Sequence, residues 1–123
     1  MAFLCPECTV GSLRIEGSLE LPPDSRSDEI TLQAVSCQDC GFSGLGVYEE
    51  SRRGSLYSEV WYYTVYRVEE EYREEVLHAI ADCPLPRSPH CPCPGHDKLG
   101  QRNGRGRWIG LKNEAVKNSW LLH

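Results

Sequence analysis

The sequence contains no long run of apolar residues; its apolar stretches extend over only a few positions. A helix needs about 20 consecutive apolar residues to cross a bilayer, so we expect no membrane-spanning helix. The opening stretch Met-Ala-Phe-Leu-Cys lacks the basic region and apolar core of a secretory signal, and we therefore expect a cytoplasmic chain. Compositional bias is also lacking: 40% of the 123 residues are hydrophobic and 25% are charged, which argues against wholesale disorder and against a fibrous protein.

Positive charge is scarce through most of the chain. Residues 1–97 hold 7 Lys and Arg against 17 Asp and Glu, whereas residues 98–123 hold 6 against 1, for a formal net charge of −5. The body of the protein would therefore repel the phosphates of nucleic acid. The basic last quarter could contact nucleic acid, the acidic body of the same chain or that of a second copy, or be only a solvated terminal segment.

The outlying feature of the composition is its seven cysteines and four histidines. In a reducing compartment such a set indicates metal ligands before disulfides, and an odd number of cysteines fits a closed disulfide framework poorly. Two Cys-x-x-Cys pairs, Cys5 with Cys8 and Cys37 with Cys40, stand at the two ends of a longer intervening segment. Tetrahedral zinc needs four ligands, and each pair can present two sulfur atoms to one side of the ion. We therefore expect these four cysteines to form one metal site.

The chain between the two pairs has the pattern of a β-hairpin. Apolar and polar residues alternate over 13–16, 19–21 and 30–33, as in half-buried strands. Residues 22–28 are rich in turn formers and would make a mobile tip. A third strand is expected over 42–49, after the second pair of cysteines.

Over about residues 1–50, the two cysteine pairs and these strands resemble the zinc ribbon, a small antiparallel sheet clamped at one end by two Cys-x-x-Cys knuckles. The resemblance implies that Cys5, Cys8, Cys37 and Cys40 are zinc ligands and that the metal holds the fold. It implies no activity, because zinc ribbons occur in transcription factors, RNA polymerase subunits, ribosomal proteins and adaptors.

Redox functions are the alternatives for this first site. Rubredoxins also hold one iron ion between two knuckles, but this sequence lacks the glycine usual after their first knuckle and their aromatic-rich segment between the pairs. A redox dithiol is less favoured still, because neither pair lies at a strand-to-helix junction where a helix dipole would lower a thiol pKa. We favour a structural metal.

The middle of the chain, residues 55–82, is first aromatic and β-branched and then acidic. We expect a strand over 61–68, although several of its apolar residues also fall at helical spacing, and a helix over 69–81 that ends before Pro84. A cluster of four aromatic residues could be either core or a stacking platform for bases, and core is favoured in a small protein. Its members are Trp61, Tyr62, Tyr63 and Tyr66.

A second metal site is expected between residues 83 and 96, a short segment that contains three cysteines and two histidines. Its expected ligands are Cys83, Cys91, Cys93 and His96, with His90 as the alternative histidine and His78 as a more distant one. The competing interpretation is a proline-rich loop with buried free thiols. A catalytic zinc would need an open position and a general base such as Asp97, but thiolate-rich closed sites are normally structural and the known zinc-hydrolase motifs are absent.

The C-terminal part contains Asn103-Gly104, a dipeptide suited to a two-residue hairpin loop. A basic, aromatic tip would result, and it is the candidate surface for nucleic acid or a partner. Its residues are Arg102, Arg105, Arg107 and Trp108. Alternatively, Trp108 fills the core while the arginines face solvent. A short helix over 114–122 is also expected, with an apolar end at residues 120–122 that would dock onto its own domain or another subunit.

Together these patterns predict a small α+β protein with an N-terminal zinc ribbon, a central helix and a Cys/His-rich C-terminal segment that holds a second zinc. We divide it into residues 1–54, 55–82 and 83–123, expected to form one compact unit. The favoured function is a non-enzymatic zinc-binding interaction module that docks on a protein partner or self-associates, with no small-molecule substrate evident. The alternatives are a nucleic-acid-binding accessory protein that uses the basic hairpin, and a small rubredoxin-like redox protein.

Overall fold

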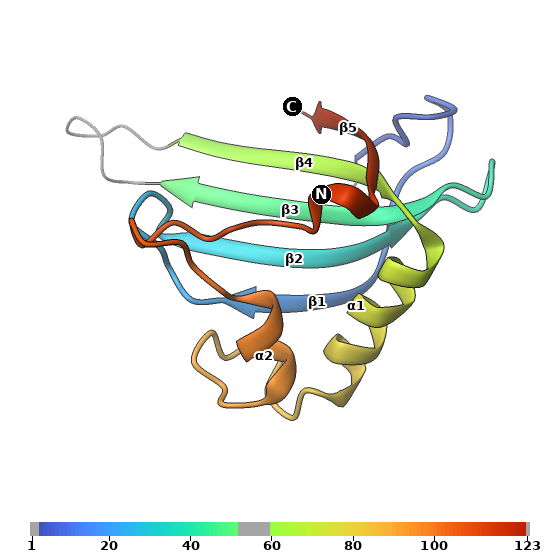
Figure 1. Ribbon diagram of the computed structural model, residues 1–123. Helices are drawn as coiled ribbons and strands as arrows, with labels where there is room; N and C mark the ends of the chain where they lie inside the picture. Colours follow the sequence, from blue (N-terminus) through green and yellow to red (C-terminus); the bar gives the residue numbers. More distant parts are fainter. Residues whose placement is uncertain (1–2, 52–59, 123) are drawn as a thin grey trace.

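The computed structural model describes residues 3–51 and 60–122, which form an α+β fold around one antiparallel sheet (Figure 1). The five strands follow one another across the sheet in chain order, β1 to β5. The strands are β1 Arg14–Leu21, β2 Glu29–Ser36, β3 Ser43–Ser51, β4 Val60–Val68 and β5 Val116–Leu122. The helices are α1 Glu70–Asp82, α2 Pro94–Leu99 and the 3-10 turn η1 Asn113–Ala115. Among the described residues, no helix is long and apolar enough to cross a membrane.

The first four strands and the helix agree with the sequence pattern. The alternating stretches over 13–16 and 19–21 are one strand, β1, with an irregularity in pairing between Ile15 and Gly17. The aromatic stretch over 61–68, whose spacing allowed either a strand or a helix, lies in the strand β4. It is extended because it pairs with β3. The expected ribbon is thus the first part of a larger sheet, to which β4 and β5 add two strands.

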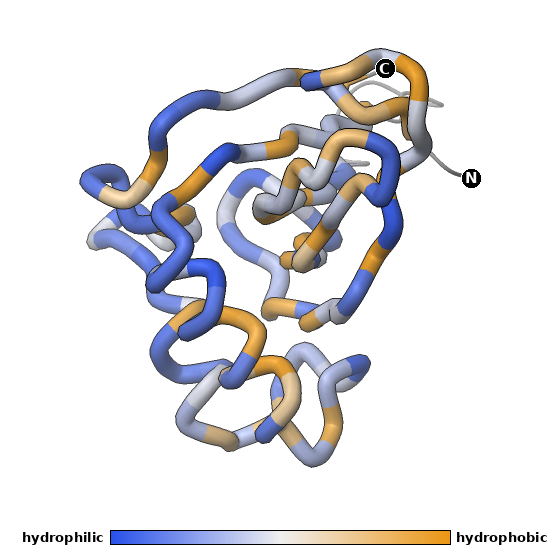
Figure 2. Tube along the Cα trace, turned by 90° about the vertical axis from the view of Figure 1, so that its right-hand side faces the viewer, coloured by the Kyte–Doolittle hydropathy of each residue, from blue (hydrophilic) through white to orange (hydrophobic). Residues whose placement is uncertain are grey.

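Both faces of the sheet carry a core, because successive side chains of each strand point to opposite sides. One face holds Leu19, Leu32 and Leu45, which pack against Val76 and Ile80 of α1. The opposite face holds a smaller core that includes residues of the N-terminal segment, Cys5 and Leu13 among them. Figure 2 shows hydrophobic and hydrophilic stretches interspersed along the chain.

Helix α1 is fixed to the sheet by a buried arginine that the apolar stripe of the helix does not reveal. Arg73 is only 7% exposed, and its Nε donates to the carbonyl of Gly44 at 3.1 Å. Its Nη2 donates to the carbonyl of Val35 at 3.0 Å and to Glu16 Oε1 at 3.2 Å. A buried guanidinium needs such partners, so Arg73 sets the position of α1 over β2 and β3.

The expected helix over residues 114–122 is wrong, since this segment forms η1 and the strand β5. Pairing with β4 places Trp120 opposite Val65 and Leu122 opposite Tyr63. Trp120 also meets the ring of Phe42 edge-on, with centroids 5.7 Å apart. Hydrogen bonds along the edge of β4 hold this segment extended, and such long-range pairing cannot be read from the segment alone.

The hairpin near residue 103 exists, but its loop differs from the expected one. The N–H of Asn103 donates to the carbonyl of Arg107 at 2.8 Å, so residues 104–106 form the loop. Gly106, with φ of +77°, takes the left-handed position that such a loop requires, and Asn103 Oδ1 accepts from the N–H groups of Arg105 and Arg107. Asn103 therefore caps the loop from its base, and does not occupy its centre.

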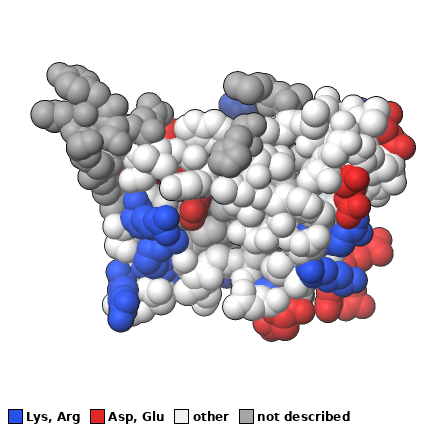
Figure 3. Space-filling view, turned by 90° about the horizontal axis from the view of Figure 1, so that it is seen from above, with Lys and Arg blue, Asp and Glu red and all other residues white. Residues whose placement is uncertain are grey.

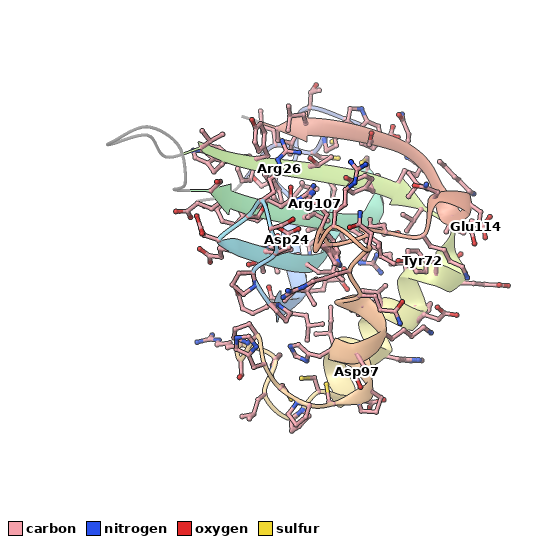
Figure 4. The ribbon with its side chains drawn as sticks, turned by 60° about the vertical axis from the view of Figure 1, so that its left-hand side comes forward. Asp24, Arg26, Tyr72, Asp97, Arg107 and Glu114 are labelled. Atoms are coloured by element: carbon pink, nitrogen blue, oxygen red, sulfur yellow. The ribbon has the colours of Figure 1, made fainter. Side chains whose placement is uncertain are left out.

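The turn between β1 and β2, expected to be mobile, is fixed to this hairpin by one buried carboxylate. Asp24 Oδ1 accepts from the N–H of Arg26 at 2.8 Å and of Ser27 at 2.6 Å. Its Oδ2 accepts from the N–H of Trp108 at 2.8 Å and from Arg107 Nη1 at 2.9 Å. Figure 4 shows the Asp24 and Arg107 labels close together where the two loops meet. Two segments that lie far apart in the sequence are thereby joined.

We predict that Asp24→Asn lowers the free energy of unfolding by about 2–4 kcal/mol, because the amide nitrogen would face donors and Arg107 would lose its counter-charge. Burial acts to raise the pKa of Asp24, but the N–H groups of Trp108, Ser27 and Arg26 and the charge of Arg107 outweigh it and lower this pKa. The stabilisation is therefore present above the ordinary pKa of about 3.9 and disappears only as pH falls through the lowered value.

Urea unfolding at pH 7.5 and at about pH 5.5 should consequently give the same difference between wild type and Asp24→Asn. The exposed Asp82→Asn variant is the matched control and should change the free energy of unfolding by less than about 0.5 kcal/mol. Equal stability of Asp24→Asn and wild type would show that the two loops do not depend on this carboxylate.

Candidate metal centres

The first candidate centre joins the N-terminal knuckle to the turn between β2 and β3. Its four sulfur atoms belong to Cys5, Cys8, Cys37 and Cys40 and all lie within 4.8 Å of one another. The Sγ atoms of Cys5 and Cys40 are 3.7 Å apart, and those of Cys8 and Cys37 are 3.8 Å apart. Four sulfurs at about 2.3 Å from a tetrahedral ion would be separated by about 3.8 Å, so the arrangement fits one metal ion.

Glycines allow the two knuckles to approach. Gly41 has φ of +77°, and its N–H donates to the carbonyl of Cys37 at 3.0 Å, which closes the second knuckle. Gly11 donates its N–H to Cys8 Sγ at 3.4 Å, and a Cβ at this position would lie 2.8 Å from Cys37 Sγ. Gly11 is thus a functional position that the sequence analysis missed. Its signal is a glycine shortly after the first Cys-x-x-Cys pair.

The thiols of this cluster differ in acidity. The N–H groups of Gly11 and Val10 lower the pKa of Cys8 to about 7. The N–H of Phe42 acts to lower the pKa of Cys40, but desolvation and the neighbouring thiols outweigh it and raise this pKa to about 12. Four thiolates therefore cannot coexist here at neutral pH without a cation, and a bound metal ion would take the place of their protons.

The second candidate centre joins the end of α1 to α2. Its ligand atoms come from Cys83, Cys91, Cys93 and His96 and also lie within 4.8 Å of one another. The Sγ atoms of Cys83 and Cys91 are 3.7 Å apart, and His96 Nδ1 lies 3.3 Å from Cys83 Sγ and 3.1 Å from Cys93 Sγ. A tetrahedral site with these ligand types would have sulfur–nitrogen separations of about 3.5 Å, close to those observed.

The histidine of this centre is held in one tautomer. His96 Nε2 lies 2.8 Å from the carbonyl oxygen of Glu20 in β1, and a carbonyl can only accept a hydrogen bond. The proton therefore resides on Nε2, which leaves the lone pair of Nδ1 directed at the three sulfurs. The other two histidines considered as ligands, His90 and His78, are exposed and lie outside the cluster.

The short helix α2 orients Cys93 and His96 together. Cys93 is the N-cap of α2, Pro94 follows at the first helical position, and the N–H of His96 donates to Cys93 Sγ at 3.4 Å. The imidazole and the backbone N–H of His96 lower the pKa of Cys93 to about 6, whereas burial, followed by the neighbouring thiols, raises the pKa of Cys83 to about 11. As at the first centre, the geometry suits a cation.

Among the described residues, neither cluster includes a carboxylate. Asp97, the residue considered as a general base, is exposed on α2 and is not among the clustered ligand atoms. Each set already supplies four protein ligands, the full number for tetrahedral coordination. The two clusters can hold metal ions in closed sites.

The basic hairpin does not present its tryptophan as a surface on which a base could stack. Trp108 is only 8% exposed and donates its Nε1–H to the carbonyl of Leu99 at 2.7 Å, so its ring is part of the core. Arg102 donates to the carbonyl of Pro23, Arg107 pairs with Asp24, and Arg105 is exposed. Figure 3 shows Lys and Arg side chains gathered at one end of the molecule and mixed charges at the other.

Comparison with known proteins gives no relative for this chain: no family model, no curated protein and no solved structure matches it. The arguments about function therefore rest on the two clusters and on the surface.

We predict that the reduced protein binds two equivalents of Co²⁺, because each cluster is a complete ligand set. Cys5→Ser/Cys37→Ser and Cys91→Ser/Cys93→Ser should each retain one equivalent. The remaining absorption should differ between the two variants, since one site has four thiolates and the other has three with an imidazole. His90→Ala and His78→Ala are the controls and should still bind two equivalents. Loss of an equivalent in His90→Ala would show that the fourth ligand is not His96.

Proposed function

We propose that the protein is a non-enzymatic interaction module whose fold is held by two structural zinc ions. The observation that carries this proposal is that both clusters present four protein ligands at tetrahedral spacing, which leaves no coordination position for water or substrate. Closed sites rich in thiolate suit zinc, which has no redox chemistry of its own and accepts sulfur and imidazole ligands.

The ligand set of the second cluster supports zinc over iron. A rubredoxin-like centre uses four thiolates, and of the two clusters only the first offers that set. The second cluster combines three thiolates with an imidazole, a common composition of structural zinc sites. Zinc accepts both four thiolates and three thiolates with an imidazole, so a single metal accounts for both clusters.

Each ion would connect segments that the sheet alone does not hold. The first would join residues 5–8 to residues 37–40, and so fasten the N-terminal segment over one face of the sheet. The second would join the end of α1 to the loop before α2, beside β1. Structural zinc contributes on the order of 10 kcal/mol to such small units, comparable to the whole stability of a typical domain.

Inductively coupled plasma mass spectrometry on untagged protein, purified without added metal, should find two zinc ions per chain. Removal of both with a chelator should unfold the protein at 25 °C, because the loss of binding free energy exceeds the stability left by the core. The buried Trp108 would report the transition by fluorescence, and added zinc should reverse it. Iron in the purified protein, or a metal-free chain that stays folded, would contradict the proposal.

Exposed apolar side chains at one end of β4 and β5 support docking on a protein surface. Val60, Tyr62 and Leu121 are 40–49% exposed. Leu121 lies opposite Thr64 in the pairing of the two strands, which places it on the same face as Tyr62, one step along the sheet. Large side chains exposed together in this way are typical of interaction surfaces. We place the docking surface here, with a partner protein or a second copy as its occupant.

The basic hairpin supports nucleic-acid binding less well. Its tryptophan is buried, so the stacking contact that would recognise a base is missing. The charge of Arg107 is neutralised by its ion pair with Asp24. A second carboxylate, the half-buried Glu49, is also close: burial raises its pKa, and the charges of Arg107 and Arg26 act in the opposite direction. Carboxylates beneath the arginines weaken the field that phosphates would meet.

Sedimentation over a concentration series should show self-association of the wild type, or co-sedimentation with a protein partner once one is identified. Tyr62→Ser/Leu121→Ser should weaken it by about a hundredfold, given roughly 1.5 kcal/mol for each of the two buried apolar side chains. Leu85→Ser removes a side chain that is 59% exposed elsewhere and should have no effect. Equal weakening by Leu85→Ser would contradict the surface. A monomer that instead binds an oligonucleotide, and loses it in Arg102→Glu/Arg105→Glu, would favour nucleic acid.

A further inference from the structure

The two clusters differ in how far solvent reaches their sulfur atoms. In the first, Cys5 and Cys37 are buried at 0% and 2% exposure, but Cys8 is half-buried and Cys40 is exposed. The first cluster therefore has one fully accessible sulfur atom and a second within reach. This asymmetry does not follow from the ligand spacing, which is similar at both sites.

The second cluster is more enclosed. Cys83 and Cys91 are 7% and 5% exposed, His96 is 5% exposed, and only Cys93 of this set is half-buried. Because one ligand in four is partly accessible, a reagent in solution meets this cluster less often than the first.

A cavity leads to the accessible pair of the first cluster. Its volume is about 580 Å³, and it is lined by both Cys8 and Cys40 together with Arg67 and Lys117. Arg67 is held in the wall by its ion pair with Glu7 and by its position 5.2 Å from the centroid of the Phe42 ring. The lining of this cavity also includes Arg73 and the carboxylates of Glu7 and Glu70, so three cations and two carboxylates share it with two cysteine sulfur atoms.

The cavities at the second cluster are smaller and differ in charge. One of about 230 Å³ touches Cys83 and Cys93 and includes Asp82 and Lys98, and one of about 360 Å³ touches Cys91 and includes Asp97. Among these three cavities, arginine and lysine side chains outnumber carboxylates only in the one at the first cluster. A hydroxide ion that forms beside a carboxylate is repelled, whereas one that forms beside an arginine or lysine is stabilised.

We propose that Cys40 is an oxidation site for peroxides, and that its oxidation opens the first cluster while the second stays intact. This inference rests on the proposed function, since it takes both clusters to be thiolate sites. The class of reagent is a small hydroperoxide, which the cavity admits and whose leaving group the excess of cations in its lining would stabilise.

The chemistry needs only the peroxide and two thiolates. The Cys40 sulfur attacks one peroxide oxygen, the O–O bond breaks, and the leaving hydroxide takes a proton to become water, which leaves a sulfenic acid on Cys40. A thiolate of the first knuckle, Cys5 or Cys8, then attacks the Cys40 sulfur, and the S–O bond breaks with loss of a second hydroxide, also protonated to water. The two thiolates have lost two electrons, and the peroxide has gained them.

The structural effect would be confined to the N-terminal segment. A disulfide between Cys40 and the first knuckle removes two of the four ligands, so residues 5–8 are no longer joined to Cys37 through a metal. Within the described part of the chain, the larger core on the opposite face contains no residue of this knuckle and adjoins the second cluster through Cys83 and Cys91. Oxidation would therefore cost the first cluster its metal, while the disulfide keeps the N-terminal knuckle beside residue 40 and the sheet and helices stay folded.

The test treats zinc-loaded full-length protein with hydrogen peroxide and follows zinc release with a chromogenic chelator, thiol loss with Ellman's reagent, and disulfides by peptide mass spectrometry. One zinc ion should leave first, with loss of two thiols and a disulfide from Cys40 to Cys5 or Cys8. Cys40→His preserves a four-ligand set and should slow this phase at least about tenfold. Cys93→His makes the same exchange at the second cluster and should leave the phase unchanged.

Three results would overturn the inference: simultaneous release of both ions, first oxidation within residues 83–93, or an unchanged rate in Cys40→His. The peptide map of the wild type is decisive even where a variant folds poorly. A protein that carries no zinc before treatment contradicts the proposed function, whereas two zinc ions with oxidation that starts at the second cluster contradicts only this inference.

Discussion

Four ligand atoms must meet within 4.8 Å at each cluster, and the rest of the structure depends on this requirement. At the first cluster it brings the N-terminal knuckle beside the turn after β2, so the chain between them must leave and return. An antiparallel pair of strands is the short route back, and β1 and β2 provide it with a register that also buries Leu19 against Leu32. The positions of the four cysteines and the hydrophobic pattern of the strands therefore favour the same hairpin. A fold is specific when local pattern and long-range contacts favour the same structure in this way.

The second cluster is hydrogen-bonded to the sheet at Glu20 of β1. Glu20 donates its N–H to the carbonyl of Pro86 and accepts from His96 Nε2 through its own carbonyl, both at 2.8 Å. The loop between α1 and α2 thus covers the outer edge of β1 at this residue. The hydrogen bond from His96 to the Glu20 carbonyl both ties the cluster to the strand and fixes the tautomer of the imidazole.

The part of the structure that the sequence predicts is the part fixed by local spacing. The two Cys-x-x-Cys pairs, the strand alternation from residue 13 to residue 49 and the helix near residue 70 all express constraints between near neighbours. The strand β5 and the buried Asp24 depend on partners that are distant in the sequence, so no local pattern announces them. The position of His96, and not His90, beside the three cysteines belongs to the same class, since it depends on how the loop after α1 packs against β1.

The cover over β1 has a consequence for the chain as it is being made. Pro86 and His96 come long after Glu20 in the sequence, so β1 emerges from the ribosome with its outer edge bare. An uncovered edge is a template for pairing with other chains, and edge pairing is a route to aggregation. Protection of this edge comes with the loop that carries Cys83 and Cys91, and an ion bound by these cysteines would hold that loop in place. The supply of metal would then decide not only how stable the finished protein is, but what fraction of nascent chains escapes precipitation.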